Sequence, residues 1–153
     1  MQVMYLGMAF TAGTLLALQA AVNSQLGKSL NGQPMMAALV SFLIGSVALF
    51  IMTVARGQFG SIALMPQQEW WKWTGGLMGA FLVCSSIIVT LKVRGANMLL
   101  FIILGHLLSG LLIDHYGFLG MPIKHIDWSK ILGVGIVLIG MVVFFFGHKV
   151  VKS

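Results

Sequence analysis

Residues 35–55 read MMAALVSFLIGSVALFIMTVA, a largely apolar run that contains no charged residue. An α-helix rises about 1.5 Å per residue, so about 20 apolar residues cross the roughly 30 Å hydrocarbon core of a bilayer. Similar runs recur along the chain and predict further spans. With the quoted stretch, they predict transmembrane helices over residues 3–22, 35–55, 71–91, 96–116 and 130–147.

The predicted fold class is therefore all-α, an integral membrane protein with five transmembrane helices. Lipid offers no partner to backbone N–H and C=O groups, so only helices or closed barrels span membranes. Barrel strands alternate apolar and polar residues, and these runs do not. The 153 residues are 59% apolar and 8% charged, against about 25% charged in typical soluble domains. Five spans fill the chain, which predicts a single transmembrane domain over residues 1–153 and leaves no room for a separate catalytic domain.

The positive charge of the chain favours a membrane over a nucleic acid as its partner. Nine Lys and Arg against three acidic residues give a net charge of +6, but they stand singly or in pairs between apolar runs. This pattern is typical of basic residues that hold helix ends at the lipid headgroups. Trp70, Trp71 and Trp73 cluster where the third span begins, as in an aromatic belt.

The numbers of Lys and Arg on the two sides of the predicted membrane protein are nearly equal, so they give little indication of its orientation. The loops on one side, with the C-terminus, carry five Lys and Arg: Lys28, Lys92, Arg94, Lys149 and Lys152. The other side carries four: Arg56, Lys72, Lys124 and Lys130. The count slightly favours the C-terminus inside. It is also what a chain that inserts in both orientations would show.

Polar residues inside spans are costly and usually face a bundle interior or a water-filled path. Gln19 and Asn23 are four residues apart, so they share one face of the first helix. There they could hydrogen-bond a substrate. The alternative is a bond to a neighbouring helix, which stabilises membrane proteins by only about 0.6 kcal/mol on average.

His106 and Asp114 are the candidates for proton coupling. His106 falls in the middle of the fourth span, where histidine suits a proton-coupled step. The alternative for His106 is a neutral ring that bonds a helix backbone or Gln19. Asp114 falls near the end of the same span, where a cation site, a tie between helices and an ordinary interfacial residue are the alternatives. No spacing among Asp114, His115, His125 and Asp127 matches a known zinc motif, so no metal is predicted. No cofactor and no enzymatic activity are predicted either, because the chain shows no phosphate-binding loop and no paired acid and base.

Gly133, Gly140 and Gly147 are seven residues apart in the fifth span. Seven residues make about two helical turns, so these glycines line one smooth stripe. Such a stripe serves a close helix–helix contact, either within one chain or between two chains.

Five segments in order resemble one known family. They are Ala17–Asn23, Ala38–Gly45, Trp73–Gly76 with Gly79 and Ala80, Gly105–His106 through Leu112–Gly117 with Gly120, and Gly133–Gly140. They are similar to the YdcZ family, five-helix members of the drug/metabolite transporter superfamily of bacterial inner membranes. His106 departs from the family pattern, in which Gln commonly follows the glycine of the fourth segment.

This resemblance implies a transporter in a bacterial inner membrane. Ten-helix relatives contain two inverted halves, so a five-helix chain implies half of an inverted-repeat transporter. The expected partner is a second copy in the opposite orientation or a paired paralogue. The fifth helix also resembles the last helix of small multidrug resistance transporters, where two glycines seven apart form the dimer seam. Those proteins use a Glu in helix one; here Gln19 is the polar residue, so cationic drugs are not implied.

The predicted function is transport of a small metabolite or drug-like molecule by alternating access in an antiparallel dimer. The residues predicted to line its site are Gln19, Asn23, Ser41 and His106. The alternative function is that of a non-transporting membrane subunit that assembles or stabilises a partner complex.

Overall fold

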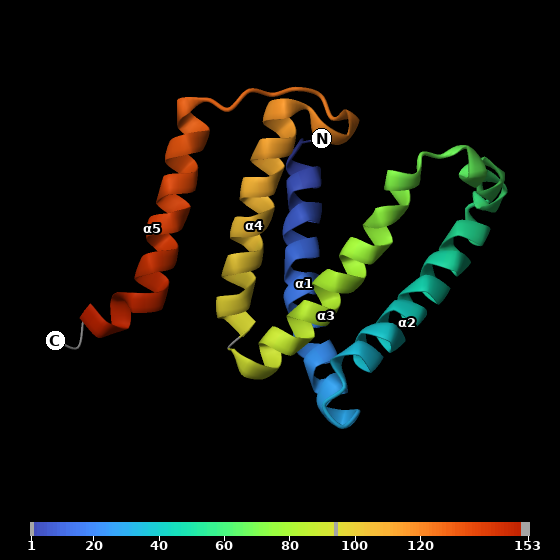
Figure 1. Ribbon diagram of the computed structural model, residues 1–153, viewed down its shortest axis with the longest axis horizontal. Coiled ribbons are helices and arrows are strands. Elements are labelled where there is room, and N and C mark those ends of the chain that lie inside the picture. Colours follow the sequence, from blue (N-terminus) through green and yellow to red (C-terminus); the bar gives the residue numbers. More distant parts are fainter. Residues whose placement is uncertain (1, 94, 151–153) are drawn as a thin grey trace. The chain divides into compact units, whose positions relative to one another are not determined.

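The computed structural model describes residues 2–93 and 95–150, with side chains up to residue 147 (Figure 1). The long helices are α1 (Gln2–Ser29), α2 (Pro34–Ala55), α3 (Thr74–Lys92), α4 (Gly95–Tyr116) and α5 (Trp128–Val150). Short 3-10 helices lie in two of the connections: η1 (Phe59–Gln67), η2 (Trp70–Trp73) and η3 (Phe118–Gly120). Five helical segments are long and apolar enough to cross a membrane, with η2 and α3 together making one of them. The predicted all-α membrane protein with five spans is confirmed.

Helix α1 is longer than the apolar run that predicted it. The run ends at residue 22, whereas the helix continues to Ser29. The added turns are polar, but Asn23, Ser24 and Gly27 are buried in them, so packing and not hydropathy supports this part of the helix. Left-handed residues Asn31 (φ 56°) and Gly32 (φ 73°) then turn the chain, and Pro34 begins α2.

The chain divides into two compact units, the first holding α1, α2 and α3 and the second α4 and α5. Each unit is described by itself below. The single transmembrane domain predicted for residues 1–153 stays a prediction.

The core of the first unit lies where the end of α1, the start of α2 and the second half of α3 meet. Ile87 of α3 and Ala37 of α2 are fully buried there. A Cβ added at Gly27 of α1 would lie 3.2 Å from Cγ2 of Ile87 and 3.8 Å from Cβ of Ala37. The missing side chain of Gly27 therefore lets the three helices approach one another closely.

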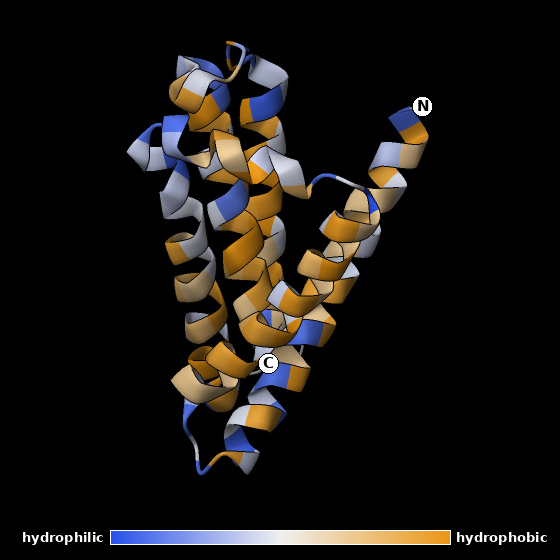
Figure 2. Cartoon of the chain, turned by 90° about the vertical axis from the view of Figure 1, so that its right-hand side faces the viewer, coloured by the Kyte–Doolittle hydropathy of each residue, from blue (hydrophilic) through white to orange (hydrophobic). Residues whose placement is uncertain are grey.

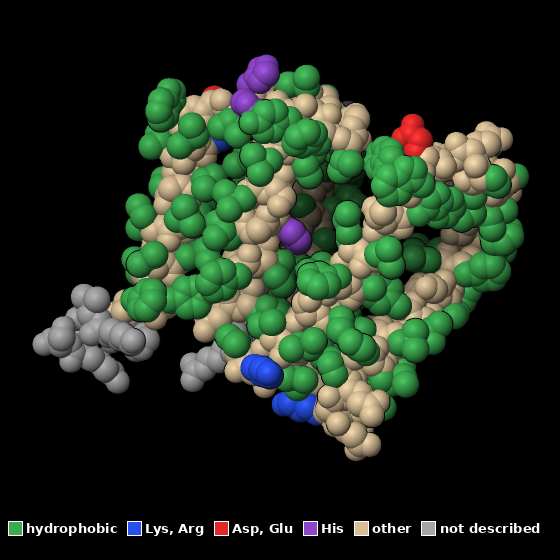
Figure 3. Space-filling model, viewed as in Figure 1, with side chains coloured by type: hydrophobic (Ala, Val, Ile, Leu, Met, Phe, Trp, Pro, Cys, Tyr) green, Lys and Arg blue, Asp and Glu red, His purple; other side chains and the backbone are tan. Residues whose placement is uncertain are grey.

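Away from this junction the helices expose their apolar side chains. Phe10 of α1 is 79% exposed, and Phe81 of α3 is 75% exposed. Hydrophobic residues recur along the helices in Figure 2, and hydrophobic side chains cover much of the face seen in Figure 3, where Lys, Arg, Asp and Glu lie near helix ends. This exposure would be unfavourable in water and suits a lipid surface or a second membrane chain.

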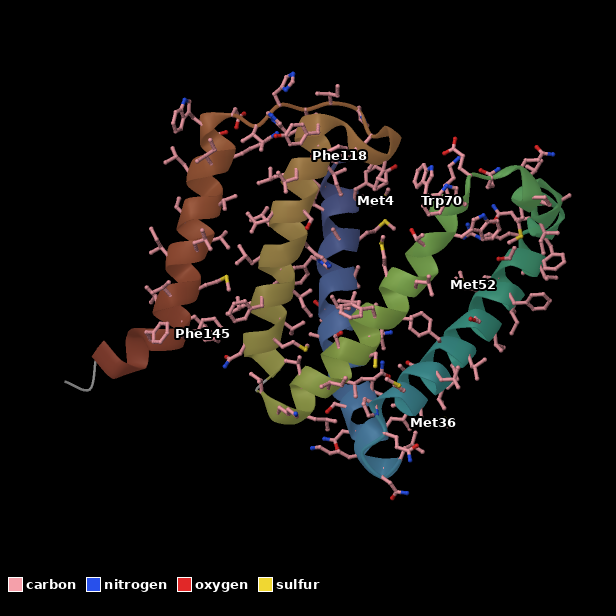
Figure 4. The ribbon with its side chains drawn as sticks, viewed as in Figure 1. Met4, Met36, Met52, Trp70, Phe118 and Phe145 are labelled. Carbon is pink, nitrogen blue, oxygen red and sulfur yellow. The ribbon has the colours of Figure 1, made fainter. Side chains whose placement is uncertain are left out.

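In the second unit, a connection folds back onto the end of α4. Gly117 ends that helix in the left-handed region (φ 65°), and a Cβ there would lie 2.6 Å from Cγ1 of Ile123. The N–H of Lys124 donates to the carbonyl oxygen of Asp114 (2.8 Å). Farther along α4, the rings of Phe101 and Phe145 lie 5.4 Å apart between their centroids, and Figure 4 shows Phe145 on the side of α5 that faces α4. The tie at Gly117 therefore holds the connection against the end of α4, and the ring pair is a contact between α4 and α5.

Asp127 begins α5 by satisfying an amide that the helix itself leaves free. Its Oδ1 accepts hydrogen bonds from the N–H of Lys130 (3.0 Å) and from Oγ of Ser129 (2.8 Å). The bond from the Lys130 amide, followed by the one from Ser129, lowers the pKa of the Asp127 carboxyl because both favour its charged form. Asp127 is thus a helix cap in this fold and has a structural role.

Replacing Gly27 by Leu tests the junction in the first unit. The new side chain must overlap Ile87 and Ala37, so we expect a loss of stability of about 1–3 kcal/mol, as in other overpacked cores. Thermal unfolding of purified protein in detergent measures this loss as a lower melting temperature. Gly13→Leu is the matched control, because an added Cβ at Gly13 meets nothing within 4 Å in the described part of the chain. Equal melting temperatures for the two variants would contradict the packing described here.

Candidate functional site

Helices α1 and α2 bring three of the four predicted site residues together. Gln19 and Asn23 lie one turn apart on α1, and Ser41 lies on α2. Oγ of Ser41 donates a hydrogen bond to Oδ1 of Asn23 (2.9 Å), and Asn23 is only 3% exposed. Gln19 is exposed beside this pair. The four-residue spacing in the sequence thus correctly predicted a shared polar face.

The amide of Asn23 is only half satisfied. Its Oδ1 has a partner in Ser41, but its Nδ2 is buried and has no hydrogen-bond partner among the residues that the structure describes. Leaving a buried donor unpaired costs about 1–3 kcal/mol, so native structures rarely keep one without a reason. A ligand or a conformational change that supplies an acceptor would recover this free energy.

Two adjoining hollows open beside the polar pair. The smaller, a cavity of about 190 Å³, is lined by Gln19, Ser41, Phe42, Gly45, Ser46, Leu49 and Val83. The larger and more open groove, about 560 Å³, is lined by Ala12, Leu15, Leu16, Leu18, Gln19, Val22, Asn23 and Ser41. Gln19 and Ser41 belong to both, so they stand at the boundary between the two hollows.

In a bilayer whose surface lies at the turn of residues 30–33, the polar residues fall within the hydrocarbon zone. Counted along the helices from the turn at residues 30–33, Asn23 and Ser41 are each about 10 Å deep and Gln19 about 16 Å deep. The hydrocarbon core is about 30 Å thick, so Gln19 falls close to its middle. A mostly apolar hollow with a few polar groups at this depth is the usual form of a binding site for a small molecule.

Ser46 is a member of the site that sequence reasoning missed. It lines the smaller cavity one helical turn beyond Ser41. The signal was present, because Ser46 is a second hydroxyl within the apolar run 35–55, next to Gly45. Serines of membrane helices often bond their own helix backbone, so this signal alone does not indicate a site.

The fourth predicted site residue, His106, lies on α4 in the second unit and is exposed within that unit. Asp114, its predicted partner in proton coupling, is half-buried near the end of the same helix. The roles of His106 and Asp114 stay predictions.

His115 ties the α4–α5 connection to α4. Its Nδ1 accepts a hydrogen bond from the N–H of Ile126 (3.0 Å), which leaves the proton of a neutral ring on Nε2. The rings of Tyr116 and His125 pack edge-on against it, with centroids 4.8 Å and 5.4 Å away. Across residues 2–93 and 95–150, no three His, Cys, Asp or Glu side chains are grouped so that they could hold a metal ion.

The second unit contains a cavity of different character. About 330 Å³ in volume, it is bounded almost wholly by apolar side chains from α4, α5 and the connection, namely Leu108, Leu111, Leu112, Ile126, Ile131 and Val134. It offers a ligand few polar contacts. The polar cluster of the first unit is therefore the stronger candidate for specific recognition.

The glycine stripe of α5 faces open space in this unit. A Cβ added at Gly133 or Gly140 would meet no atom within 4 Å in the part of the chain that the structure describes. A Cβ at Gly147 would meet only Cγ1 of Val143, one turn earlier in the same helix, at 3.5 Å. The role of these three glycines in dimer packing stays a prediction.

Five spans with a polar cluster at mid-depth define a multi-pass membrane protein. Comparison with known proteins gives its family: residues 4–143 match the family described as "Putative inner membrane exporter, YdcZ". This chain belongs to that YdcZ family, as its five segments predicted. It is also similar to the inner membrane protein YdcZ of Escherichia coli (strain K12), with 27% identity over 107 residues that cover 69% of this chain and 71% of that protein.

No solved structure matches the chain. The family comparison and the five apolar helices together make this protein a multi-pass protein of the inner membrane. The family description is that of an exporter and not of an enzyme.

The Ser41–Asn23 hydrogen bond can be tested by substitution. Ser41→Ala removes the donor to Oδ1 and leaves both ends of the buried Asn23 amide unpaired, which we expect to cost about 1–3 kcal/mol. The measurement is again the melting temperature in detergent. Ser46→Ala removes a hydroxyl from the same cavity at an exposed position, so its melting temperature should stay near that of the unmodified protein. A Ser41→Ala variant as stable as Ser46→Ala would refute a structural role for this bond.

Proposed function

We propose that this protein exports a small molecule across the inner membrane by alternating access, with Gln19, Asn23, Ser41 and His106 at its substrate site. The observation that carries the proposal is the polar cluster of α1 and α2, which lines two hollows at mid-membrane depth. Intramembrane polar groups that are neither at a helix end nor fully paired mark substrate pathways more often than scaffolds. The description of its family as one of exporters supports the same function.

The proposed assembly is an antiparallel pair of chains, either two copies or one copy and a paralogue. An odd number of spans gives two successive halves opposite orientations, so two chains can reproduce an inverted repeat. The large apolar surface of the five helices and the open stripe at Gly133 and Gly140 are both compatible with a second chain. In this assembly the two bundles rock around the site at their interface, which opens it to one side at a time.

His106 and Asp114 are proposed to couple proton movement to transport. Both can exchange protons, and both lie on α4 within or near the hydrocarbon zone. In this role His106 replaces the Gln that is common at this position in the family, so proton dependence would distinguish this chain from relatives that carry Gln.

Transport by purified protein tests the function. In liposomes that contain the protein, we expect a saturable flux of an accepted metabolite, recorded by isotope uptake and by currents on a solid-supported membrane. Gln19→Ala should lower the flux about 10-fold or more, because it removes the exposed hydrogen-bonding group shared by both hollows. Gln25→Ala is the matched control on the same helix, since Gln25 is exposed and lines neither hollow.

Two results would count against this proposal. Unchanged flux in both Gln19→Ala and His106→Ala would place the substrate site elsewhere. Absence of flux across a wide panel of metabolites, together with stable capture of a second membrane protein, would favour the non-transporting subunit.

The glycine stripe gives a separate test of the dimer. Gly140→Leu would place a bulky side chain in the proposed seam, so we expect much less cross-linked dimer in detergent and in membranes. Gly135→Leu is the matched control, because Gly135 lies on another face of α5 and a Cβ there also meets nothing within 4 Å in the described chain. Equal cross-linking of both variants would refute the seam. A C-terminal reporter fusion active on only one side of the membrane would rule out two copies in opposite orientations and leave a paralogue as the partner.

A further inference from the structure

The two hollows of the first unit share a chemical property that limits what they can bind. Every polar side chain that lines them is an amide or a hydroxyl, namely Gln19, Asn23, Ser41 and Ser46. The other lining residues are Ala, Leu, Val, Phe or Gly. No ionisable side chain of the first unit lines either hollow as the structure describes them, and His106, which the proposed function adds to the site from α4, carries no charge in its neutral form.

A charged ligand would be poorly matched to such a lining. At mid-membrane depth, an ion without a counter-charge loses its hydration and gains only neutral dipoles in return. A neutral polar ligand loses far less hydration free energy on leaving water. Amide and hydroxyl groups of the lining can take the place of the water molecules that were hydrogen-bonded to it. The lining therefore favours neutral polar ligands over charged ligands of the same shape.

Asn23 indicates which kind of hydrogen-bonding group the site lacks. Its Nδ2 is a donor, it is buried, and no acceptor reaches it. The Oδ1 of the same amide accepts a hydrogen bond from Oγ of Ser41, so in this structure the donor end is the one left unpaired. What the site lacks is an acceptor oxygen or nitrogen.

From these observations we infer that the substrate is an uncharged polar molecule bearing a carbonyl, amide or hydroxyl oxygen that accepts a hydrogen bond from Nδ2 of Asn23. The inference rests on the proposed transport function and names the substrate class of the same site. Asn23 lines the larger groove, but Nδ2 itself is covered in this conformation. Contact with the substrate therefore requires a rotation of the amide or a small separation of α1 from α2, and substrate binding would stabilise that opened form.

Three matched sets of probes test this class directly, each with a neutral, an anionic and a cationic member of similar shape. They are nicotinamide, nicotinate and 1-methylnicotinamide; glucose, gluconate and glucosamine; and phenylacetamide, phenylacetate and phenethylamine. Counterflow of isotope-labelled probe into liposomes containing the full-length protein is compared with protein-free liposomes. We expect saturable counterflow of the neutral member of at least one set, at least 10-fold faster than its charged counterparts.

Substitutions at Asn23 test the assigned donor. Asn23→Asp keeps the shape of the side chain but replaces the donor by a carboxylate, so counterflow of the neutral probe should fall 10-fold or more while the cationic member of the same set gains. Gln25→Glu adds the same charge two residues away, outside both hollows, and should leave the preference unchanged. If Asn23→Asp does not fold, the preference of the unmodified protein among the three members still decides the substrate class.

The remaining outcomes separate the two proposals. Saturable counterflow of an anionic or cationic member in preference to the neutral one would overturn the substrate class and leave the transport function standing. Neutral counterflow that is unchanged in Asn23→Asp would overturn the role given to Asn23. No saturable counterflow of any of the nine probes, together with no flux in the wider metabolite panel, would overturn both the transport function and this inference.

Discussion

The constraint on which the structure depends is that a bilayer offers no hydrogen bonds to the backbone. Every peptide group in the hydrocarbon zone must find its partner within the protein, and a helix does so locally. Five apolar helices follow from this constraint. Compared with a protein in water, the distribution of side chains is reversed, because many Phe and Leu side chains are exposed whereas Asn23 and Ser24 are buried. Because lipid is as apolar as these side chains, the helices are held together by close packing and by a few polar contacts.

The first unit has close packing and polar contacts at successive turns of α1. Gly27 lets Ile87 and Ala37 close one end of the three-helix junction. One turn above Gly27, Asn23 pairs with Ser41, and one turn higher Gln19 faces the hollows. Close packing thus fixes the helices just below the polar groups, which holds those groups in place without filling the space in front of them. A site supported in this way can bind a small molecule specifically while its walls remain apolar.

The sequence predicted the features that depend on local patterns. Hydropathy predicted the number of spans. The spacing of Gln19 and Asn23 gave their common face. The end of α1 could not be predicted from the sequence, because the polar turns after residue 22 are kept helical by packing against other helices. For the same reason the half-satisfied amide of Asn23 and the part played by Ser46 depend on where α2 lies against α1, which no periodicity encodes.

The position of the tight junction at one end of the first unit has a mechanical consequence. The buried residues of α2 are Ala37 and Ala38, close to its first turn, whereas residues 39–55 are exposed or half-buried along about 26 Å of helix. Such a helix can tilt about its packed first turn, which then acts as a pivot. A tilt of about 5° at the pivot would carry its far end about 2 Å sideways. Gly27, which permits the close pivot, would then set the range over which the opposite end of the unit can open.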